Sequence, residues 1–235
     1  MPRYLWDRTL ASQNESVESA GERNGGMWRF FRDHRSVRLV SVLVFLIAGL
    51  MGVAQAADSS QEQIARLIAA ARAQIGVTKY YDSGYAVIAY PNGDVPVERG
   101  VCTDVLIRAY REIGIDLQRL VHEDMAANFT KYPKLWGLSH PDANIDHRRV
   151  PNLMVFFARK GQALPLSQSA ADYLPGDIVS WQLPSGVPHI GIVSDTPAEG
   201  ARYQMIHNIG AGTQCEDCLF EFKITGHYRY PVSAR

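Results

Sequence analysis

Hydrophobic positions in the middle of the chain recur every three to four residues. In residues 61–75, five apolar side chains share one face: Ile64, Leu67, Ile68, Ala71 and Ile75. This is the spacing of an amphipathic helix. The same spacing predicts further helices over residues 101–113, 116–125 and 151–159. Residues 80–100 are rich in Tyr, Gly, Pro and Asp without a period, which predicts a long loop of the kind that often carries function.

The period changes towards the C-terminus. Short apolar runs separated by turn residues predict strands at hairpin spacing over residues 176–181, 189–193, 203–207, 219–224 and 227–230. Helices that come first and strands that follow are typical of an α+β protein with an antiparallel sheet. We therefore expect N-terminal helices packed on a small antiparallel β-sheet.

The N-terminal part of the chain has a different pattern. Basic residues concentrate between positions 27 and 38, an apolar run covers residues 39–53, and the small-x-small sequence Ala54-Gln55-Ala56 follows. This order is that of a secretory signal peptide, whereas a retained membrane anchor needs a longer apolar run of about 20 residues. Residues 1–56 therefore form an extension and signal peptide with cleavage near Ala56. We expect export to the periplasm and one mature domain over residues 57–235, with no stable membrane span.

Composition and charge exclude some classes of partner. The chain has 24 Lys and Arg against 24 Asp and Glu, so its formal net charge is zero. Bulk electrostatics therefore give no reason to expect binding to nucleic acid or an anionic membrane. The hydrophobic content of 46% is enough for a full core. We expect no cofactor, and the sequence does not determine the oligomeric state.

Three cysteines in an exported protein leave one thiol unpaired. Cys215 and Cys218 form a C-x-x-C pair, for which a local disulfide is the leading interpretation. Redox catalysis and a zinc site are alternatives, although acidic residues flank the pair and no second C-x-x-C is present. Cys102 is then left over, and an unpaired thiol in an oxidising compartment indicates reactivity.

Two residues at the ends of predicted elements suggest thiol chemistry. Cys102 lies at the predicted start of a helix, where the unpaired N–H groups and the helix dipole stabilise a thiolate and offer donors to an oxyanion. His189 opens a predicted strand after Pro188, where it can take the thiol proton and later protonate a leaving group. The structural alternatives are an inert core cysteine and a strand-end histidine.

His207 ends the next predicted strand. In an antiparallel pair the end of one strand lies near the start of the other, so we expect His207 near His189. There it can orient the imidazole as the third member of a triad does. Asn208 is an alternative for this role, and a turn residue before Gly210 is the structural alternative.

A dense charged run precedes the helix predicted over residues 151–159. It consists of Asp146, His147, Arg148 and Arg149. One interpretation is a substrate-binding wall in which an arginine holds a carboxylate with two hydrogen bonds. The other, which we favour, is a helix N-terminus with internal ion pairs.

Several motifs resemble known bacterial families. Residues 175–179, 189–193 and 206–207 resemble strand motifs of the NlpC-type cell-wall peptidases, a papain-like superfamily. Almost the whole of residues 76–230 resembles more closely the YijF-like family of bacterial domains of unknown function. The closely matching segments are Arg99-Gly100-Val101-Cys102-Thr103-Asp104, His122-Glu123-Asp124-Met125, residues 144–153, Pro188-His189-Ile190-Gly191-Ile192-Val193, His207-Asn208-Ile209-Gly210 and Gly226-His227-Tyr228-Arg229-Tyr230.

The superfamily resemblance implies a papain-like fold and roles for three residues. Cys102 would be the nucleophile, His189 the general base and His207 the orienting residue in the cleavage of amides next to D-amino acids in peptidoglycan stems. The sequence departs from the superfamily in one respect, because the acid Asp104 follows the cysteine, whereas the superfamily usually has Asp-Cys-Ser-Gly. This departure leaves the choice of substrate open.

The resemblance also implies a tyrosine that helps to bind the oxyanion from the loop before the nucleophile. Tyr81 is the candidate by position, and Tyr80, Tyr85 and Tyr90 compete with it.

These observations predict an exported cysteine amidase or endopeptidase that acts on peptidoglycan peptides through a thioester. Three alternatives use the same residues. They are a non-catalytic module that holds cell-wall peptide in the cleft, an acyltransferase that uses the same thiol, and a metal site formed by Cys102, His189 and His207.

Overall fold

The computed structural model describes residues 60–230. These residues all fall within one compact unit. The predicted signal peptide, residues 1–56, lies outside the described residues. Within the described residues, no helix is both long enough and apolar enough to cross a bilayer.

Helices come first in the chain, as the three-to-four spacing predicts. The first is helical from residue 60 to residue 72. The next three are α2 (Cys102–Glu112), α3 (Leu117–Asn128) and α4 (Val150–Lys160). Four short 3-10 helices complete the set: η1 (Phe129–Lys131), η2 (Asp146–Arg148), η3 (Ala170–Asp172) and η4 (Glu199–Ala201). The predictions over residues 101–113, 116–125 and 151–159 are confirmed, with shifts of a few residues at the ends.

The C-terminal strands form one sheet of six strands, in the order β3-β8-β4-β5-β6-β7, with every neighbouring pair antiparallel. Its strands are β3 (Gln162–Ala163), β4 (Ile178–Gln182), β5 (Pro188–Pro197), β6 (Tyr203–Asn208), β7 (Thr213–Glu216) and β8 (Lys223–Arg229). The expected α+β class, with helices followed by an antiparallel sheet, is confirmed.

The end of the sheet differs from the prediction in two ways. Residues 219–224 do not form a strand of their own, because a turn from Cys218 to Glu221 interrupts them and β8 starts only at Lys223. In addition, the sequence analysis did not predict β7. Its residues, Thr-Gln-Cys-Glu, show no alternation of apolar and polar side chains, as befits a short strand at the sheet edge.

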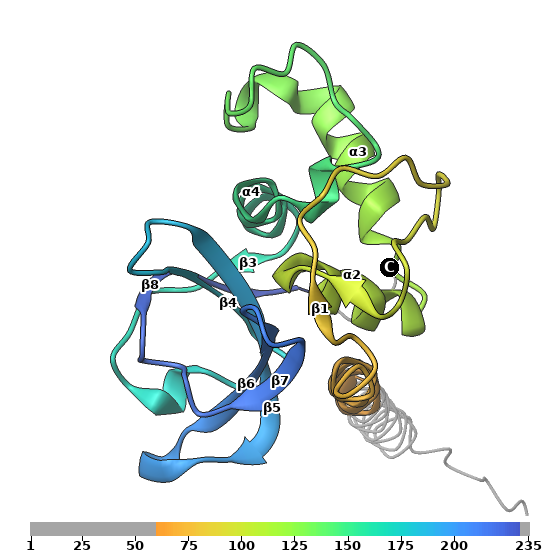
Figure 1. The fold of residues 1–235 in the computed structure, drawn as a ribbon. Helices are drawn as coiled ribbons and strands as arrows, with labels where there is room; N and C mark the ends of the chain where they lie inside the picture. The colour runs from red at the N-terminus through yellow and green to blue at the C-terminus, as the bar shows by residue number, and fades with distance from the viewer. Residues whose placement is uncertain (1–59, 231–235) are drawn as a thin grey trace, which may run out of the picture. The chain divides into compact units, whose positions relative to one another are not determined.

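The side chains of the sheet divide between its two faces, as the two-residue period of a strand requires. Ile178, Ile190, Ile192 and Ile206 pack with the helices in the larger core cluster. Val179, Trp181, Val193 and Met205 pack together in a second, smaller cluster. Helices α2 and α4 both contact β5, and α3 contacts α2 and α4 (Figure 1).

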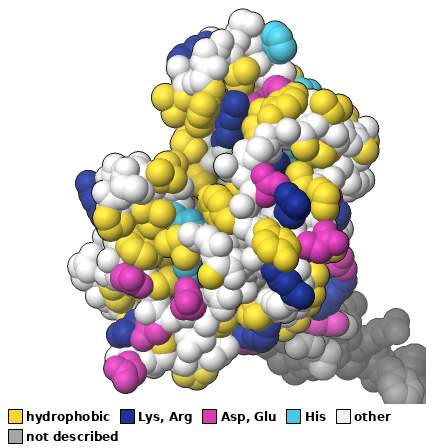
Figure 2. All heavy atoms as spheres, viewed as in Figure 1, with side chains coloured by type: hydrophobic (Ala, Val, Ile, Leu, Met, Phe, Trp, Pro, Cys, Tyr) yellow, Lys and Arg dark blue, Asp and Glu magenta, His cyan; other side chains and the backbone are white. Residues whose placement is uncertain are grey.

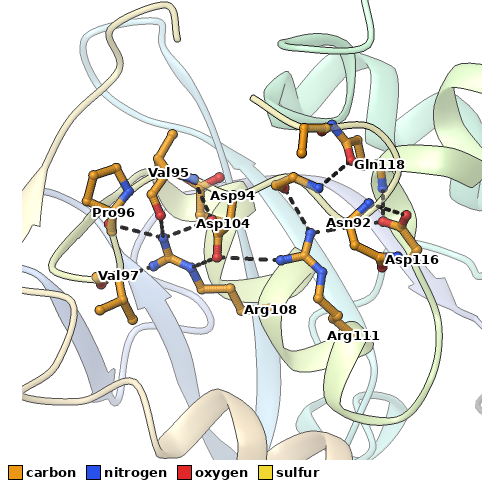
Figure 3. Close-up of polar contacts among 12 residues, drawn as sticks. Asn92, Asp94, Val95, Pro96, Val97, Asp104, Arg108, Arg111, Asp116 and Gln118 are labelled. Carbon is orange, nitrogen blue, oxygen red and sulfur yellow. Dashed lines mark hydrogen bonds and ion pairs between the residues drawn. The ribbon is translucent and has the colours of Figure 1, made fainter. Parts of the chain in front are cut away.

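The predicted loop of residues 80–100 is closed by a pair of two-residue strands. β1 (Tyr80–Tyr81) pairs in parallel with β2 (Arg99–Gly100). Between them the backbone is held on α2 by a network of polar contacts (Figure 3). The buried Arg108 donates to Asp94 at 2.9 and 3.0 Å and to the Arg99 carbonyl at 2.9 Å. The loop is therefore fixed by hydrogen bonds rather than by apolar packing.

Candidate functional site

Cys102 is the first residue of α2, and the residue before it, Val101, has extended backbone. Its thiol is buried, and burial raises its pKa to about 12. The nearby charge of Asp104 acts in the same direction. Backbone N–H groups of Ile190, Thr103 and Cys102 itself oppose the shift without overcoming it. The resting group is therefore a neutral thiol, and not the thiolate that a helix N-terminus on its own would favour.

Asp104, the acid that follows the cysteine, builds the start of this helix. Its carboxylate accepts a hydrogen bond from the Val101 N–H at 2.7 Å and two from Arg148, both at 2.9 Å. Both side chains of the Asp104–Arg148 pair are buried, so each needs the other to offset its loss of hydration. A Cβ at Gly100 would lie 3.0 Å from an oxygen of Asp104, which explains the glycine at that position.

Tyr81 lies beside the thiol because β1 pairs with β2. The register sets Tyr81 opposite Gly100, two residues before Cys102. Burial raises the pKa of Tyr81 to about 12, and the charge of Cys102 and a hydrogen bond with its side chain add to the shift. Arg148 donates to the carbonyls of Asp82 at 3.0 Å and Gly84 at 3.1 Å, which holds the segment after Tyr81 in place.

The three competing tyrosines have other contacts, although Tyr85 lines the same cleft as Cys102. The Tyr85 hydroxyl donates to Asp142 at 3.1 Å. The ring of Tyr90 packs edge-on against His122, with 5.2 Å between ring centroids, and Tyr80 is 61% exposed. Of the four candidates, Tyr81 is the one that interacts with Cys102.

His189 and His207 lie side by side at the ends of β5 and β6, as the sequence predicts. Nε2 of His189 and Nδ1 of His207 are 2.8 Å apart, a hydrogen bond between buried rings. His207 Nε2 lies 3.1 Å from Oε2 of Glu216 on β7. The two contacts form a chain from Glu216 through His207 to His189.

The hydrogen bonds from Glu216 through His207 to His189 determine which nitrogen of each ring carries the proton. A carboxylate only accepts hydrogen bonds, so Glu216 requires the proton of His207 on Nε2. Nδ1 of a neutral His207 must then accept the hydrogen bond that it shares with His189. His189 accordingly carries its proton on Nε2, which leaves its Nδ1 as a free base.

Glu216 was not among the residues predicted from the sequence, because its strand β7 has no alternation of apolar and polar side chains. A carboxylate at an alternate position in the strand that pairs with the His207 strand is the signal that would have found it.

Trp181 on β4 packs against both histidine rings. It stacks on His189 at 28° with 5.7 Å between ring centroids, and its own Nε1 donates to the Leu219 carbonyl at 2.9 Å. A Cβ at Gly191 would lie 3.1 Å from His207 Cβ and 3.3 Å from the Trp181 ring, so only glycine allows these rings to approach so closely.

Burial also keeps both histidines neutral. It lowers the pKa of His189 to about 3, and the neighbouring charge of His207 adds to that shift. Burial lowers the pKa of His207 as well, while Glu216 opposes the shift.

Cys102 and His189 are connected through consecutive residues at the start of β5. Cys102 packs with Ile190 on the helix side of the sheet, whereas His189 stacks on Trp181 of the second cluster. The thiol interacts with the backbone N–H of Ile190, the residue next to His189. Among the described residues, the structure contains no hydrogen bond between the Cys102 thiol and the His189 ring. The thiol therefore meets the backbone next to His189, while the His189 ring lies with Trp181 on the other face of the strand.

Asn208 does not orient His189, contrary to the alternative that we considered. Its side-chain amide donates to the Gly100 carbonyl at 3.1 Å, and its oxygen accepts from the Gly210 N–H at 3.1 Å. Asn208 follows His207 directly, so its side chain points to the opposite face of the strand. It ties the end of β6 to the segment that carries Cys102.

The run of residues 146–149 divides into separate roles. Asp146 and His147 are buried; burial raises the pKa of Asp146 and lowers that of His147 to about 3. Arg148 is engaged by Asp104 and by the loop after Tyr81. Asp146, His147 and Arg148 therefore fit the structural interpretation. Arg149 lies with its guanidinium 4.1 Å above the ring of Trp136.

The expected disulfide between Cys215 and Cys218 is absent from the described structure, where all three cysteines are free thiols. The two sulfurs have different neighbours. Cys215 Sγ lies 3.2 Å from Gln204 Oε1, whereas Cys218 Sγ lies 3.4 Å from His207 Nε2. Cys215 sits in β7 and Cys218 in the turn after it, which directs their side chains to these separate places.

A cleft of about 380 Å³ opens beside the thiol. Its walls include Cys102, Tyr81, Trp136, Arg149 and Pro188, the residue before His189. On the face shown in Figure 2, hydrophobic side chains gather where the helices meet the sheet. A larger hollow of about 560 Å³ lies between residues 66–77 and α2, but none of the predicted site residues lines it. The chemistry therefore points to the smaller cleft, whose volume suits a small peptide.

Within residues 60–230, no group of three or more His, Cys, Asp or Glu side chains is arranged to hold a metal ion. The alternative of a metal site on Cys102, His189 and His207 thus has no support in the described geometry.

The fold carries a candidate thiol site. It consists of a neutral thiol at a helix N-terminus with a cleft beside it, and of a relay of two histidines and a glutamate. The chain belongs to the family described as "Domain of unknown function (DUF1287)", whose model matches residues 68–230. It is 58% identical over 162 residues to "Uncharacterized protein YijF" of Escherichia coli strain K12, covering 69% of this chain and 79% of that protein. The predicted YijF-like membership is confirmed.

A solved structure, that of NlpC1 from Trichomonas vaginalis, also matches the chain. The match has a TM-score of 0.37 and 18% sequence identity. It covers 68% of this chain and 42% of that protein.

Proposed function

We propose that the protein is an exported, periplasmic cysteine hydrolase with a papain-like arrangement, which cleaves amide bonds in peptidoglycan peptides. The observation that carries this proposal is the relay from Glu216 through His207 to His189, which ends one residue from the amide that contacts the Cys102 thiol. A purely structural histidine pair would not require a thiol at a helix N-terminus against the same strand.

The reaction follows from the proton positions. The free Nδ1 of His189 takes the proton of the Cys102 thiol as the sulfur attacks the carbonyl carbon of the amide. The N–H groups at the start of α2 and the Tyr81 hydroxyl stabilise the oxyanion that forms. His189 then gives the proton to the leaving amine, and a thioester remains on Cys102. Water hydrolyses the thioester to a carboxylic acid and restores the thiol.

His189 must turn towards the thiol for the first step. Catalytic hydrogen bonds are often long without substrate and tighten in the complex. We expect this movement when a substrate fills the cleft beside Cys102.

The test is mass spectrometry of peptidoglycan fragments after incubation with the purified full chain. We expect cleaved stem peptides with the wild type and none with Cys102→Ala or His189→Ala. Cys215→Ala is the matched control, because it removes a free thiol outside the cleft and should retain activity. Equal products from wild type and Cys102→Ala, at several pH values, would contradict the proposal. Transfer of the acyl group to an amine instead of water would indicate an acyltransferase.

A second candidate is a non-catalytic module that binds cell-wall peptide in the same cleft. Two observations favour it: the raised pKa of the Cys102 thiol and the lack of a hydrogen bond to His189 in the described structure. Binding of stem peptides with equal affinity by wild type and Cys102→Ala, without turnover, would support this candidate over the hydrolase.

A further inference from the structure

The cleft beside Cys102 has a one-sided charge. Among the described residues that line it, Arg148 and Arg149 are the charged side chains, and none is Asp or Glu. A cleft of this kind favours an anionic group on the bound molecule.

The two arginines differ in what already occupies them. Arg148 donates to both carboxylate oxygens of Asp104 and to two loop carbonyls, so most of its donors are engaged. The guanidinium of Arg149 forms a long ion pair with Asp146 and makes no hydrogen bond to any described residue. The closest acidic group, on Asp146, lies 3.6 Å away, beyond hydrogen-bond distance. Nη1 of Arg149 and Oδ1 of Asp146 are the two atoms of this ion pair, and neither has a hydrogen-bond partner. The guanidinium therefore has donors to offer to a ligand.

The stacking partner of Arg149 is itself unusual. Trp136 is 50% exposed and adopts a left-handed backbone conformation, with φ of 61°. Bulky residues rarely adopt this conformation, and such residues cluster at binding sites. The Trp136 ring covers one face of the guanidinium at 4.1 Å and leaves the donors at its edge for a planar acceptor.

Arg149 also lies at a defined place relative to the nucleophile. The hydroxyl of Thr103, the residue after Cys102, donates to the Arg148 carbonyl at 3.0 Å. Arg149 is therefore one residue beyond a direct contact of the α2 start, and it lines the same cleft as Cys102. A group bound by Arg149 would therefore share the cleft with the amide under attack.

We propose that Arg149, backed by Trp136, is a carboxylate-binding subsite that selects substrates with a free carboxylate close to the scissile amide. The peptide nature of the substrate rests on the proposed function, whereas the preference for a carboxylate rests on the cleft itself. A carboxylate matches the paired donors of a guanidinium and would supply the close hydrogen bonds that the 3.6 Å ion pair with Asp146 does not give.

The first experiment measures binding rather than turnover. Stem peptide with all carboxylates free, and a set of peptides with one carboxylate converted to carboxamide, are titrated by calorimetry into full-length Cys102→Ala protein. We expect one amidation to weaken binding roughly 10- to 100-fold. Adding Arg149→Gln to Cys102→Ala should weaken binding of the free acid by a similar factor. The double variant should then bind the free acid and the amidated peptide with equal affinity. Arg149→Lys should be intermediate, because it keeps the charge without the planar pair of donors.

Arg119→Gln is the matched control, since it removes an exposed arginine outside the cleft. Thermal melting checks that each variant folds. Equal binding of all the amidated peptides, or unchanged binding of the free acid by Arg149→Gln, would overturn the subsite. If binding depends on the carboxylate and on Arg149 but the wild type cleaves no peptide, the hydrolase proposal is contradicted and the subsite is not.

A second measurement separates the subsite from the peptide. Sodium glutarate is titrated against glutaramide while the side-chain Nε–H resonance of Arg149 is followed by NMR and assigned by its loss in Arg149→Gln. If glutarate but not glutaramide shifts the Arg149 resonance and no stem peptide binds, the result supports the subsite and contradicts peptidoglycan as the substrate. If glutarate causes no shift and no stem peptide binds, the subsite itself is overturned.

Discussion

Glu216 lies 3.1 Å from Nε2 of His207 and thereby determines which nitrogen of His189 is free. The proton on His207 Nε2 leaves Nδ1 to accept from His189 at 2.8 Å. A half-exposed acid on an edge strand thus controls the basic nitrogen of a buried ring two side chains away.

Replacement of Glu216 by glutamine tests this relay. Glutamine can donate as well as accept, so it no longer requires one tautomer of His207. Since Glu216 is half exposed, solvent screening limits the effect, and we expect kcat for peptide cleavage to fall about 3- to 10-fold with KM little changed. Glu221→Gln is the control, because Glu221 acts on His207 by charge alone. A purely structural role would leave the pH profile of kcat unchanged, and that outcome would contradict the relay.

Tyr81→Phe removes one hydroxyl beside the thiol and keeps the ring. We expect kcat for amide cleavage to fall roughly 10- to 100-fold, because a donor to the oxyanion is lost. Alkylation of Cys102 by iodoacetamide forms no oxyanion and should change far less. Tyr80→Phe, which changes an exposed tyrosine that does not line the cleft, should leave kcat within about threefold. Equal losses in the two variants would count against a role for Tyr81 in the reaction.

Alkylation of Cys102 without substrate should follow the raised pKa of its thiol. A thiol with a pKa of about 12 has little thiolate at neutral pH, so the rate should rise about tenfold per pH unit between pH 7 and 10. The measurement is mass spectrometry of the peptide that contains Cys102, with urea-unfolded protein as the reference. A rate that is already constant below pH 7 would reveal a thiolate–imidazolium pair and contradict this expectation.

The buried His147 predicts a loss of stability in acid. Its pKa is lowered in the fold to about 3 from the ordinary 6.5, so the unfolded chain binds one more proton between these values. Stability is therefore fully present above about pH 6.5 and lost as pH falls towards 3, by up to about 1.4 kcal/mol per pH unit. His189 acts in the same direction.

The free energy of unfolding, measured in urea from pH 7 to 4, should depend less steeply on pH in His147→Gln than in the wild type. His140→Gln, which changes an exposed histidine, should keep the wild-type slope. Identical slopes for all three proteins would rule out this role of His147.

Residues with a strong local pattern were predictable from the sequence. The apolar spacing around Val105 and Leu106 predicted α2, and the alternating run at Ile190 and Ile192 predicted β5, because periodicity reports directly on which face is buried. The nearness of His189 to His207 followed from the geometry of antiparallel strands. The polar strand that carries Glu216 had no such signal.

The sequence by itself determined the α+β class, the family and the pairing of the two histidines. The tertiary structure alone decided which of four tyrosines interacts with the thiol and which of two adjacent arginines still has side-chain donors without hydrogen bonds. It also decided that Cys215 and Cys218 face different neighbours and that burial keeps Cys102 a neutral thiol. The reason is that these properties depend on desolvation and on contacts between segments far apart in the chain, such as Asp104 with Arg148, and no local pattern records them.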